Sequence, residues 1–126
     1  MSEREIKNAL IGGVSLGRED HGILSFWLML DFYGFHQAFG GYSMDSPVKV
    51  DGKFKREGNA FGCQCIIEIL DTVGAESWDK LQGKPVRAIL EGHTIKGIMN
   101  IIDDSRTFIP SELYEQKYKE KEATKS

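Results

Sequence analysis

The order of apolar and polar residues predicts strands over most of the first 45 positions. Residues 5–16 predict an opening strand that two glycines weaken, and a turn is expected at residues 18–22. The β-branched and aromatic residues of 23–33 predict a strand buried on much of both faces. After a turn at Gly34, residues 35–45 alternate loosely and predict a third strand.

The third strand contains two adjacent glycines, Gly40 and Gly41. Such a pair inside a strand predicts a bulge, or a close approach by another backbone or by a ligand. From Ser46 to Gly58 the composition shifts to Pro, Asp, Gly and Lys, so a loop or a short hairpin is expected there.

A helix is predicted directly after this loop. Asn59 is a suitable N-cap, and Gly74 is a suitable C-terminal stop. Nearly every position between them is apolar, apart from one narrow polar stripe made of Gln64, Glu68 and Asp71. Such a helix is expected to be covered on more than one side. A single small sheet cannot wrap it that far, so we expect a second copy of the chain and hence a homo-oligomer.

The last third of the chain predicts two more strands and a second helix. Residues 76–84 form a polar connector with a helical turn, and 85–92 and 94–102 are strands joined by a tight hairpin. A helix is expected from Pro110, and its charged end at about 117–126 is expected to fray. The chain is thus expected to be one domain, 1–126, of the α+β class: a small antiparallel sheet with one main buried helix and a C-terminal helix.

The chain has 126 residues, with 16 Lys and Arg against 19 Asp and Glu, which gives a net charge of −3. This balance argues against broad attraction to duplex nucleic acid or anionic lipid, so an anion site must be local. No apolar run reaches the roughly twenty residues needed to span a bilayer. Since the N-terminus carries mixed charges and no cleavage pattern, we expect a cytoplasmic protein.

The two cysteines do not predict a metal centre. Cys63 and Cys65 are two positions apart in the predicted helix and therefore point to nearly opposite faces. The three histidines are spread over separate loops and strands, so a zinc set would have to assemble from afar. We expect both cysteines to be buried as small apolar residues, with no metal and no cofactor.

Catalysis is the less favoured reading of the acidic and histidine residues. Asp20 and His21, or Asp103 and Asp104, could supply an acid and a base. A hydrolase also needs a nucleophile held beside the base, and no nucleophile elbow or paired-cysteine motif is present. Catalytic residues assembled in space stay open, and His21 is expected to cap a turn.

A basic stretch precedes the main helix and suggests an anion site. Lys53, Lys55 and Arg56 lie just upstream of a helix N-terminus, whose unpaired N–H groups and partial positive charge attract anions. Gly58 and Gly62 would let a phosphate come close. The spacing matches neither a Walker loop nor a dinucleotide fingerprint, and the plainer reading is an exposed hairpin with solvated charges.

Aromatic residues and a second cation add to this candidate site. Phe39, Tyr42 and Phe61 flank the glycine pair and the helix start, where a base could stack on them. They could equally be core. Arg106 could reach a phosphate across a subunit boundary, or it could pair with a neighbouring aspartate.

Three segments carry a resemblance to a known family: residues 17–45, 58–90 and 95–113. Their most specific elements are E-D-H-G, F-G-G-Y, G-x-A-F-G at the helix start, and V-G-x-E-S-W-x-x-L-x-G-K. From about Ile6 to Leu113 the chain resembles the phage Thoeris anti-defence proteins of the first type. These are sponges that capture nucleotide signals.

The resemblance implies a phage protein that acts in the host bacterial cytoplasm. It would bind the cyclic ADP-ribose isomers made by TIR-domain enzymes without cleaving them, and so keep the defence effector inactive. It also implies a Tudor-like antiparallel sheet with added helices, and homodimers with ligand pockets between subunits. Some members assemble further and also hold cyclic oligonucleotides.

Carried over by position, the motif implies a pocket formed by Phe39, Gly40, Tyr42, Asn59, Ala60 and Phe61, with Arg56 and Arg106 on phosphate. The cations rest on the charge argument as much as on the resemblance. The chain departs from the family at Asn59, where a small hydroxyl residue is usual, at residues 32–39, and in its charged tail. The first departure bears on which cyclic nucleotide is preferred.

Two other classes of function stay open. One is an enzyme that degrades the same signal, with His21 or Asp104 as acid or base. The other is an inhibitor that binds a host protein through exposed aromatic and C-terminal charged surfaces. Intact or altered ligand recovered from the protein discriminates the first, and a co-purifying host polypeptide favours the second.

Overall fold

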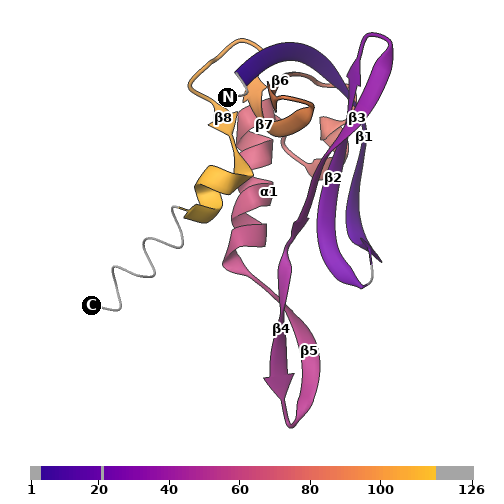
Figure 1. Ribbon diagram of the computed structural model, residues 1–126, viewed down its shortest axis with the longest axis vertical. Coiled ribbons are helices and arrows are strands. Elements are labelled where there is room, and N and C mark those ends of the chain that lie inside the picture. The colour runs from indigo at the N-terminus through magenta and orange to yellow at the C-terminus, as the bar shows by residue number, and fades with distance from the viewer. Residues whose placement is uncertain (1–3, 21, 116–126) are drawn as a thin grey trace, which may run out of the picture.

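The computed structural model describes residues 4–20 and 22–115, and these form an α+β fold. Six antiparallel strands lie in the order β3-β2-β1-β6-β7-β8, and β4 and β5 form a separate two-stranded sheet (Figure 1). The predicted fold class is therefore confirmed. The strands are Arg4–Asp20 (β1), Ile23–Phe32 (β2), Phe35–Ser43 (β3), Asp45–Val50 (β4), Lys53–Gly58 (β5), Pro85–Glu91 (β6), Thr94–Asn100 (β7) and Thr107–Phe108 (β8).

The long strands β1, β2 and β3 form an antiparallel meander that curls on itself. Burial along β2 alternates: Leu28 is fully buried, whereas Trp27 and Met29 on the opposite face are 39% and 42% exposed. The prediction that this strand is buried on much of both faces is wrong, because helix and core cover only one face of the sheet. The edge strand β3 curls round to the β6–β7 turn, where the Gln37 side-chain amide donates to the His93 carbonyl at 2.8 Å.

The predicted close approach at the glycine pair of β3 is confirmed. Gly40 and Gly41 both have positive φ, and the β2–β3 register shifts beside them. A Cβ on Gly40 would lie 2.4 Å from the Phe26 carbonyl oxygen, and one on Gly41 would clash with the Trp27 ring. Glycine is therefore required at both positions by backbone conformation and by space.

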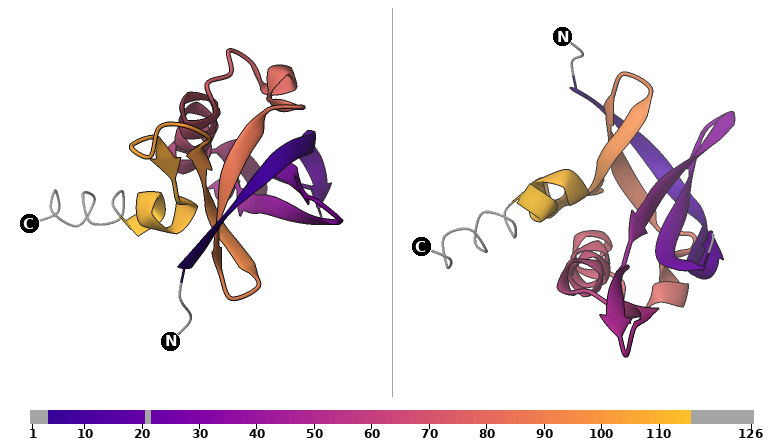
Figure 2. Two further views of the ribbon diagram at one scale, coloured as in Figure 1. Left: turned by 90° about the horizontal axis from the view of Figure 1, so that it is seen from above. Right: turned by 60° about the horizontal axis from the view of Figure 1, so that its bottom comes forward.

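Strands β4 and β5 form a hairpin that projects from the body of the molecule, here called the arm (residues 45–58) (Figure 1). The short hairpin considered for residues 46–58 is present, with pairing from Asp45↔Gly58 to Val50↔Lys53. Its two-residue turn is Asp51-Gly52, with positive φ at both positions, as tight hairpin turns require. The view from below in Figure 2 shows the arm extending from the end of the sheet.

The main helix α1 runs from Ala60 to Val73, with the predicted caps. The Asn59 side chain accepts the Gly62 N–H, and Gly74 ends the helix in the left-handed conformation. One face of α1 packs on the sheet through Cys65 and Ile69, both fully buried, whereas Ile67 is 46% exposed. The chain by itself thus covers one side of the helix, and the second copy expected on the other side stays a prediction.

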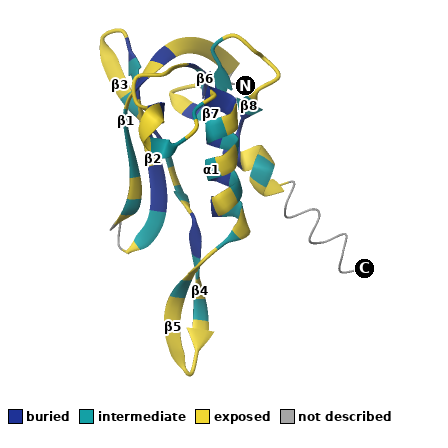
Figure 3. Ribbon diagram, turned by 180° about the vertical axis from the view of Figure 1, so that it is seen from behind, coloured by how far each residue is buried: buried dark blue, intermediate teal, exposed yellow. Residues whose placement is uncertain are grey.

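Shorter elements close the fold as predicted, with one addition. Trp78–Leu81 forms a 3-10 turn, η1, that buries Leu81, and β6 and β7 form the expected hairpin. The two-residue strand β8 is not predicted from the sequence. The C-terminal helix begins at Pro110, is described to residue 115, and lies beside α1 (Figures 2 and 3). The predicted frayed segment 117–126 lies outside the described residues.

None of the helices in the described part of the chain combines the length and the apolar character that a membrane span requires.

Gly62 fixes how closely α1 approaches the segment between β3 and β4. A Cβ there would lie 2.5 Å from the Met44 Cα. We expect Gly62→Ala to lower the free energy of unfolding by about 1–3 kcal/mol, because the overlap outweighs the gain of about 1 kcal/mol in helix propensity. Urea denaturation measures this change. Gly13→Ala, where nothing lies within 4 Å, is the matched control, and equal stabilities of the two variants would contradict the prediction.

Candidate functional site

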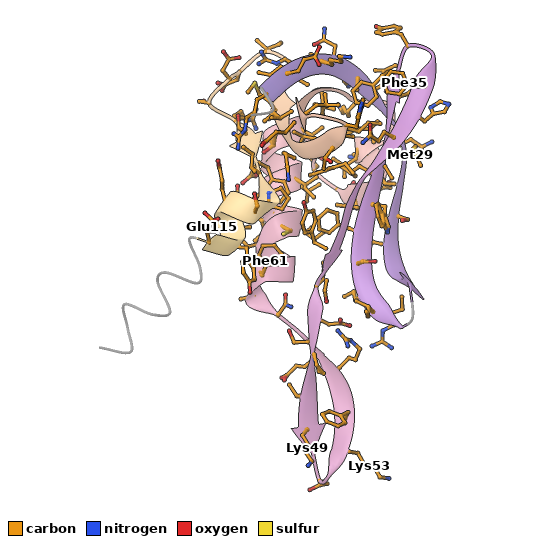
Figure 4. The ribbon with its side chains drawn as sticks, in the orientation of Figure 1. Met29, Phe35, Lys49, Lys53, Phe61 and Glu115 are labelled. Atoms are coloured by element: carbon orange, nitrogen blue, oxygen red, sulfur yellow. The ribbon has the colours of Figure 1, made fainter. Side chains whose placement is uncertain are left out.

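A cleft of about 510 Å³ lies where the β3–β4 segment, the start of α1 and the C-terminal helix meet. Figure 4 labels Phe61 and Glu115 on two of these elements, above the base of the arm. The lining is mainly aromatic and neutral polar, with two carboxylates. It comprises Tyr42, Ser43, Asp45, Ser46, Asn59, Phe61, Pro110, Ser111, Tyr114 and Glu115.

Aromatic rings form two sides of the cleft. The ring of Phe61, in the first turn of α1, meets Tyr114 edge to face, with centroids 5.6 Å apart. Tyr42 stacks at 6.1 Å on Phe26 of the core, so its ring is held in place from behind. Burial, and to a lesser degree Cys65, raises the pKa of Tyr42, so its phenol is protonated near neutral pH.

The N-terminus of α1 opens into the same cleft. The Asn59 side chain accepts the Gly62 N–H at 2.7 Å and donates to the Ser46 hydroxyl at 3.1 Å, while its backbone N–H donates to the Met44 carbonyl. This cap satisfies one first-turn amide. Within the described part of the chain, the N–H groups of Ala60 and Phe61 have no acceptor, as is usual for the first positions of a helix.

An ion pair between the buried Asp45 and the partly exposed Arg56 fixes the base of the arm beside the cleft. Arg56 donates through Nε to Asp45 Oδ1 at 2.8 Å and through Nη2 to the Asp45 carbonyl at 3.1 Å. The Asp45 carboxylate also accepts the Leu24 N–H from β2, at 3.1 Å. The hydrogen bond from Arg56 is the main reason that the pKa of Asp45 is lowered. The arm is thus tied to the sheet through a charged group with little exposure to water.

Three of the predicted site residues come together in the cleft: Tyr42, Asn59 and Phe61. Ala60 is exposed in the first turn of α1, next to them. Two others serve the fold instead. Phe39 is 2% exposed and packs against the rings of Tyr42 and Phe108, and Gly40 lies against the backbone of β2.

The predicted cations do not gather at the cleft in a single chain. Arg56 is bound to Asp45, and Lys53 lies at the tip of the arm, away from the helix start (Figure 4). Arg106 lies near Gly74, at the C-terminal end of α1, so the length of the helix separates it from Asn59. The anion site suggested by the basic stretch is therefore not assembled from the side chains of one chain.

Sequence reasoning missed the contribution of the C-terminal helix to the cleft. Pro110, Ser111, Tyr114 and Glu115 line it, although the helix itself was predicted. Positions 111, 114 and 115 have the three- and four-residue spacing of one helix face. That spacing could have marked a common face, but not which part of the molecule the face would meet.

None of the described histidines and cysteines belongs to the lining of the cleft. His36 is exposed on β3, 3.4 Å from Asp31, and His21 is outside the described residues. Cys65 is buried, and burial raises the pKa of its thiol to about 12, whereas Cys63 is exposed, so its predicted burial is wrong. No cluster of potential metal ligands occurs among the described residues.

Comparisons with protein-family models, with curated proteins and with solved structures gave no match to this chain.

The ion pair at the base of the arm predicts a pH-dependent stability. A carboxyl group whose pKa is lowered by folding adds stability above its ordinary pKa, here 3.8, and loses it as the pH falls through the lowered value. We expect the stability difference between wild type and Asp45→Asn to be largest near pH 7 and to shrink below pH 4.

Urea denaturation at a series of pH values measures this difference. Asp71→Asn, an exposed change on α1, is the control and should follow wild type throughout. A difference between wild type and Asp45→Asn that stays constant down to pH 2 would contradict the assignment.

Proposed function

We propose that the chain binds a cyclic ADP-ribose isomer or a related cyclic nucleotide in this cleft and sequesters it without cleavage. One observation carries the proposal: aromatic rings and the start of α1 line the same cleft. Tyr42, Phe61 and Tyr114 supply the rings, and Asn59 and Phe61 bring the first turn of α1 to the cleft. A purine with an attached phosphate needs both kinds of group.

The size and the lining of the cleft suit such a ligand. Its volume of about 510 Å³ lies within the range of about 300–1,000 Å³ that is usual for small-molecule sites. A base stacked on Phe61 would gain dispersion and apolar burial, as in single-strand nucleotide binding. The hydroxyl group of Ser111 would then orient a ribose.

Within one chain, a phosphate would be recognised by backbone N–H groups rather than by cationic side chains. Two unpaired amides at the start of a helix favour an anion through direct hydrogen bonds and through the helix dipole. The described lining residues include no lysine or arginine, and the charge of Arg56 is already neutralised by Asp45. A tight site for a pyrophosphate would thus gain from a further cation, which agrees with the proposed homodimer.

The resemblance to the Thoeris anti-defence proteins supplies the biological role in this proposal. A phage protein in the host cytoplasm would hold the signal made by a TIR-domain enzyme, so that the effector is not activated. Sequestration requires slow release rather than turnover. Affinity must also exceed the low-micromolar range, which corresponds to only about −8 kcal/mol.

Incubation with a panel of TIR-derived and cyclic oligonucleotide signals tests the proposal directly. The complex is separated from free ligand and denatured, and the released molecules are identified by mass spectrometry. Recovery of one signal in intact form is expected. Recovery of a chemically altered product would indicate an enzyme instead of a sponge. A protein that retains no signal but co-purifies with a host polypeptide would indicate a protein-binding inhibitor.

Removal of the Phe61 ring should weaken nucleotide binding. We expect Phe61→Ala to raise Kd by about tenfold or more, because a stacked base contributes about 1–3 kcal/mol. Isothermal titration calorimetry measures the change, with circular dichroism as the check of folding. Tyr33→Ala removes a ring that is 91% exposed outside the cleft and is the control. Equal affinities of the two variants would remove Phe61 from the site.

Arg106→Ala reports whether another copy contributes to the site. Because Arg106 lies at the far end of α1 within one chain, a direct phosphate contact requires a second chain. The sequence-based prediction is a weaker affinity for the nucleotide in calorimetry. An unchanged Kd would leave Arg106 as a residue of the 103–106 turn.

A further inference from the structure

The arm exposes apolar side chains and cations that the rest of the chain does not use. Phe54 is 80% exposed and Val50 is 50% exposed, although both lie within paired strands. Lys49, Lys53 and Lys55 surround them, and all three are exposed. An exposed phenylalanine on a projecting hairpin is suited to the apolar centre of a contact surface, and the lysines around it to the polar rim.

The lysines of the arm have no partners in the part of the chain that the structure describes. No ion pair or hydrogen bond of the side chains of Lys49, Lys53 or Lys55 occurs there. Residues 49–55 contain these three lysines and one aspartate, whereas the chain as a whole has a net charge of −3. The tip of the arm, residues 49–55, is therefore basic on an otherwise more acidic molecule, and the cleft of a second copy offers the Glu115 carboxylate as a group of opposite charge.

The arm also carries apolar groups on both of its faces. Cross-strand partners point to the same side, so Lys49 and Phe54 share one face while Val50 and Lys53 share the other. A two-stranded hairpin is only marginally stable alone, and a partner that contacts both faces would stabilise it. A flat surface such as a bilayer could cover one face only, and Asp51 at the turn would be the first residue to enter it.

The base of the arm lines the cleft of its own chain, but the tip, residues 49–55, extends away from that cleft. Figure 4 shows Lys49 and Lys53 at the tip of the arm, on the far side of its base from Phe61 and Glu115. The Asp45–Arg56 pair and the Asn59–Ser46 hydrogen bond hold that base in place. Six residues of β4 span about 20 Å, enough to cross a cleft on another molecule.

We propose that the arm of one copy lies across the mouth of the cleft of a second copy, and that the exchange is reciprocal. Phe54 meets Tyr114, which is 58% exposed, at the mouth of the cleft, so that the more buried rings of Tyr42 and Phe61 are left to the nucleotide. The lysines face the Glu115 carboxylate. The partner's lysines then stand where the cleft's own lining has no cation. Their contribution to phosphate binding rests on the proposed function, whereas the docking itself does not.

Photo-crosslinking between distinguishable copies tests the docking. A chain with benzoylphenylalanine at position 54 is mixed with an isotopically labelled chain, irradiated and digested. The expected product joins position 54 of one copy to residues 42–46, 59–61 or 110–115 of the other. The same probe at position 33, which is 91% exposed, is the control. Crosslinks within one copy only, or to other segments, would overturn the proposal.

The oligomeric state gives an independent measurement. Light scattering coupled to gel filtration should show a dimer for wild type and for Ile102→Ser, a change at a residue that is 86% exposed elsewhere. Phe54→Ser combined with Val50→Ser should raise the dimer dissociation constant at least tenfold. A monomeric wild type, or a dimer that both substitutions leave unchanged, would contradict arm docking. Arm docking would also be contradicted if the monomer bound an oligonucleotide or anionic vesicles through the arm.

The lysines are tested separately with the nucleotide signal. Lys53→Ala and Lys55→Ala together should weaken binding about tenfold and reduce its salt dependence, while the dimer and the crosslinks persist. Unchanged affinity would remove the lysines from the site. Crosslinks without nucleotide binding would refute the proposed function and retain the docking, whereas tight binding by a monomer would refute the docking and retain the function.

Discussion

The geometry of the cleft and of the arm depends on the buried carboxylate of Asp45. It is 5% exposed, and an ion so placed is stable only with compensating partners. Those partners come from two elements, the Leu24 amide of β2 and the Arg56 guanidinium of β5. Because neither can move away without leaving a buried charge unsatisfied, the base of the arm is fixed to the sheet.

The residue before Asp45 extends this constraint to the helix. The Met44 N–H donates to the Leu24 carbonyl, and the Met44 carbonyl accepts the Asn59 N–H. Gly62 allows α1 to pack on the same backbone. The segment between β3 and β4 is therefore the junction of sheet, arm and helix, and the cleft lies beside it. The use of Arg56 in this junction has a functional consequence: the cation nearest to the helix start is unavailable to a phosphate in the same cleft.

Local features of the fold could be predicted from the sequence because local energetics decide them. Asn59 and Gly74 delimit α1 since an N-cap side chain and a left-handed glycine satisfy the ends of any helix. Gly40 and Gly41 indicated a close backbone approach for a similar reason. Burial was less predictable. The strand 23–33 is rich in apolar residues, yet one of its faces is open, because composition does not reveal how many layers cover a sheet.

The same distinction between local features and tertiary packing applies to the candidate site. The sequence by itself determined that aromatic residues, a helix N-terminus and a group of cations occur near one another along the chain, and Tyr42, Asn59 and Phe61 do line one cleft. Only the tertiary structure decided that the C-terminal helix completes this cleft, that Arg56 forms an ion pair with Asp45, and that Arg106 lies at the opposite end of α1. The physical reason is that side-chain type and spacing set what a residue can bind, whereas its partner is the group that packing places within reach.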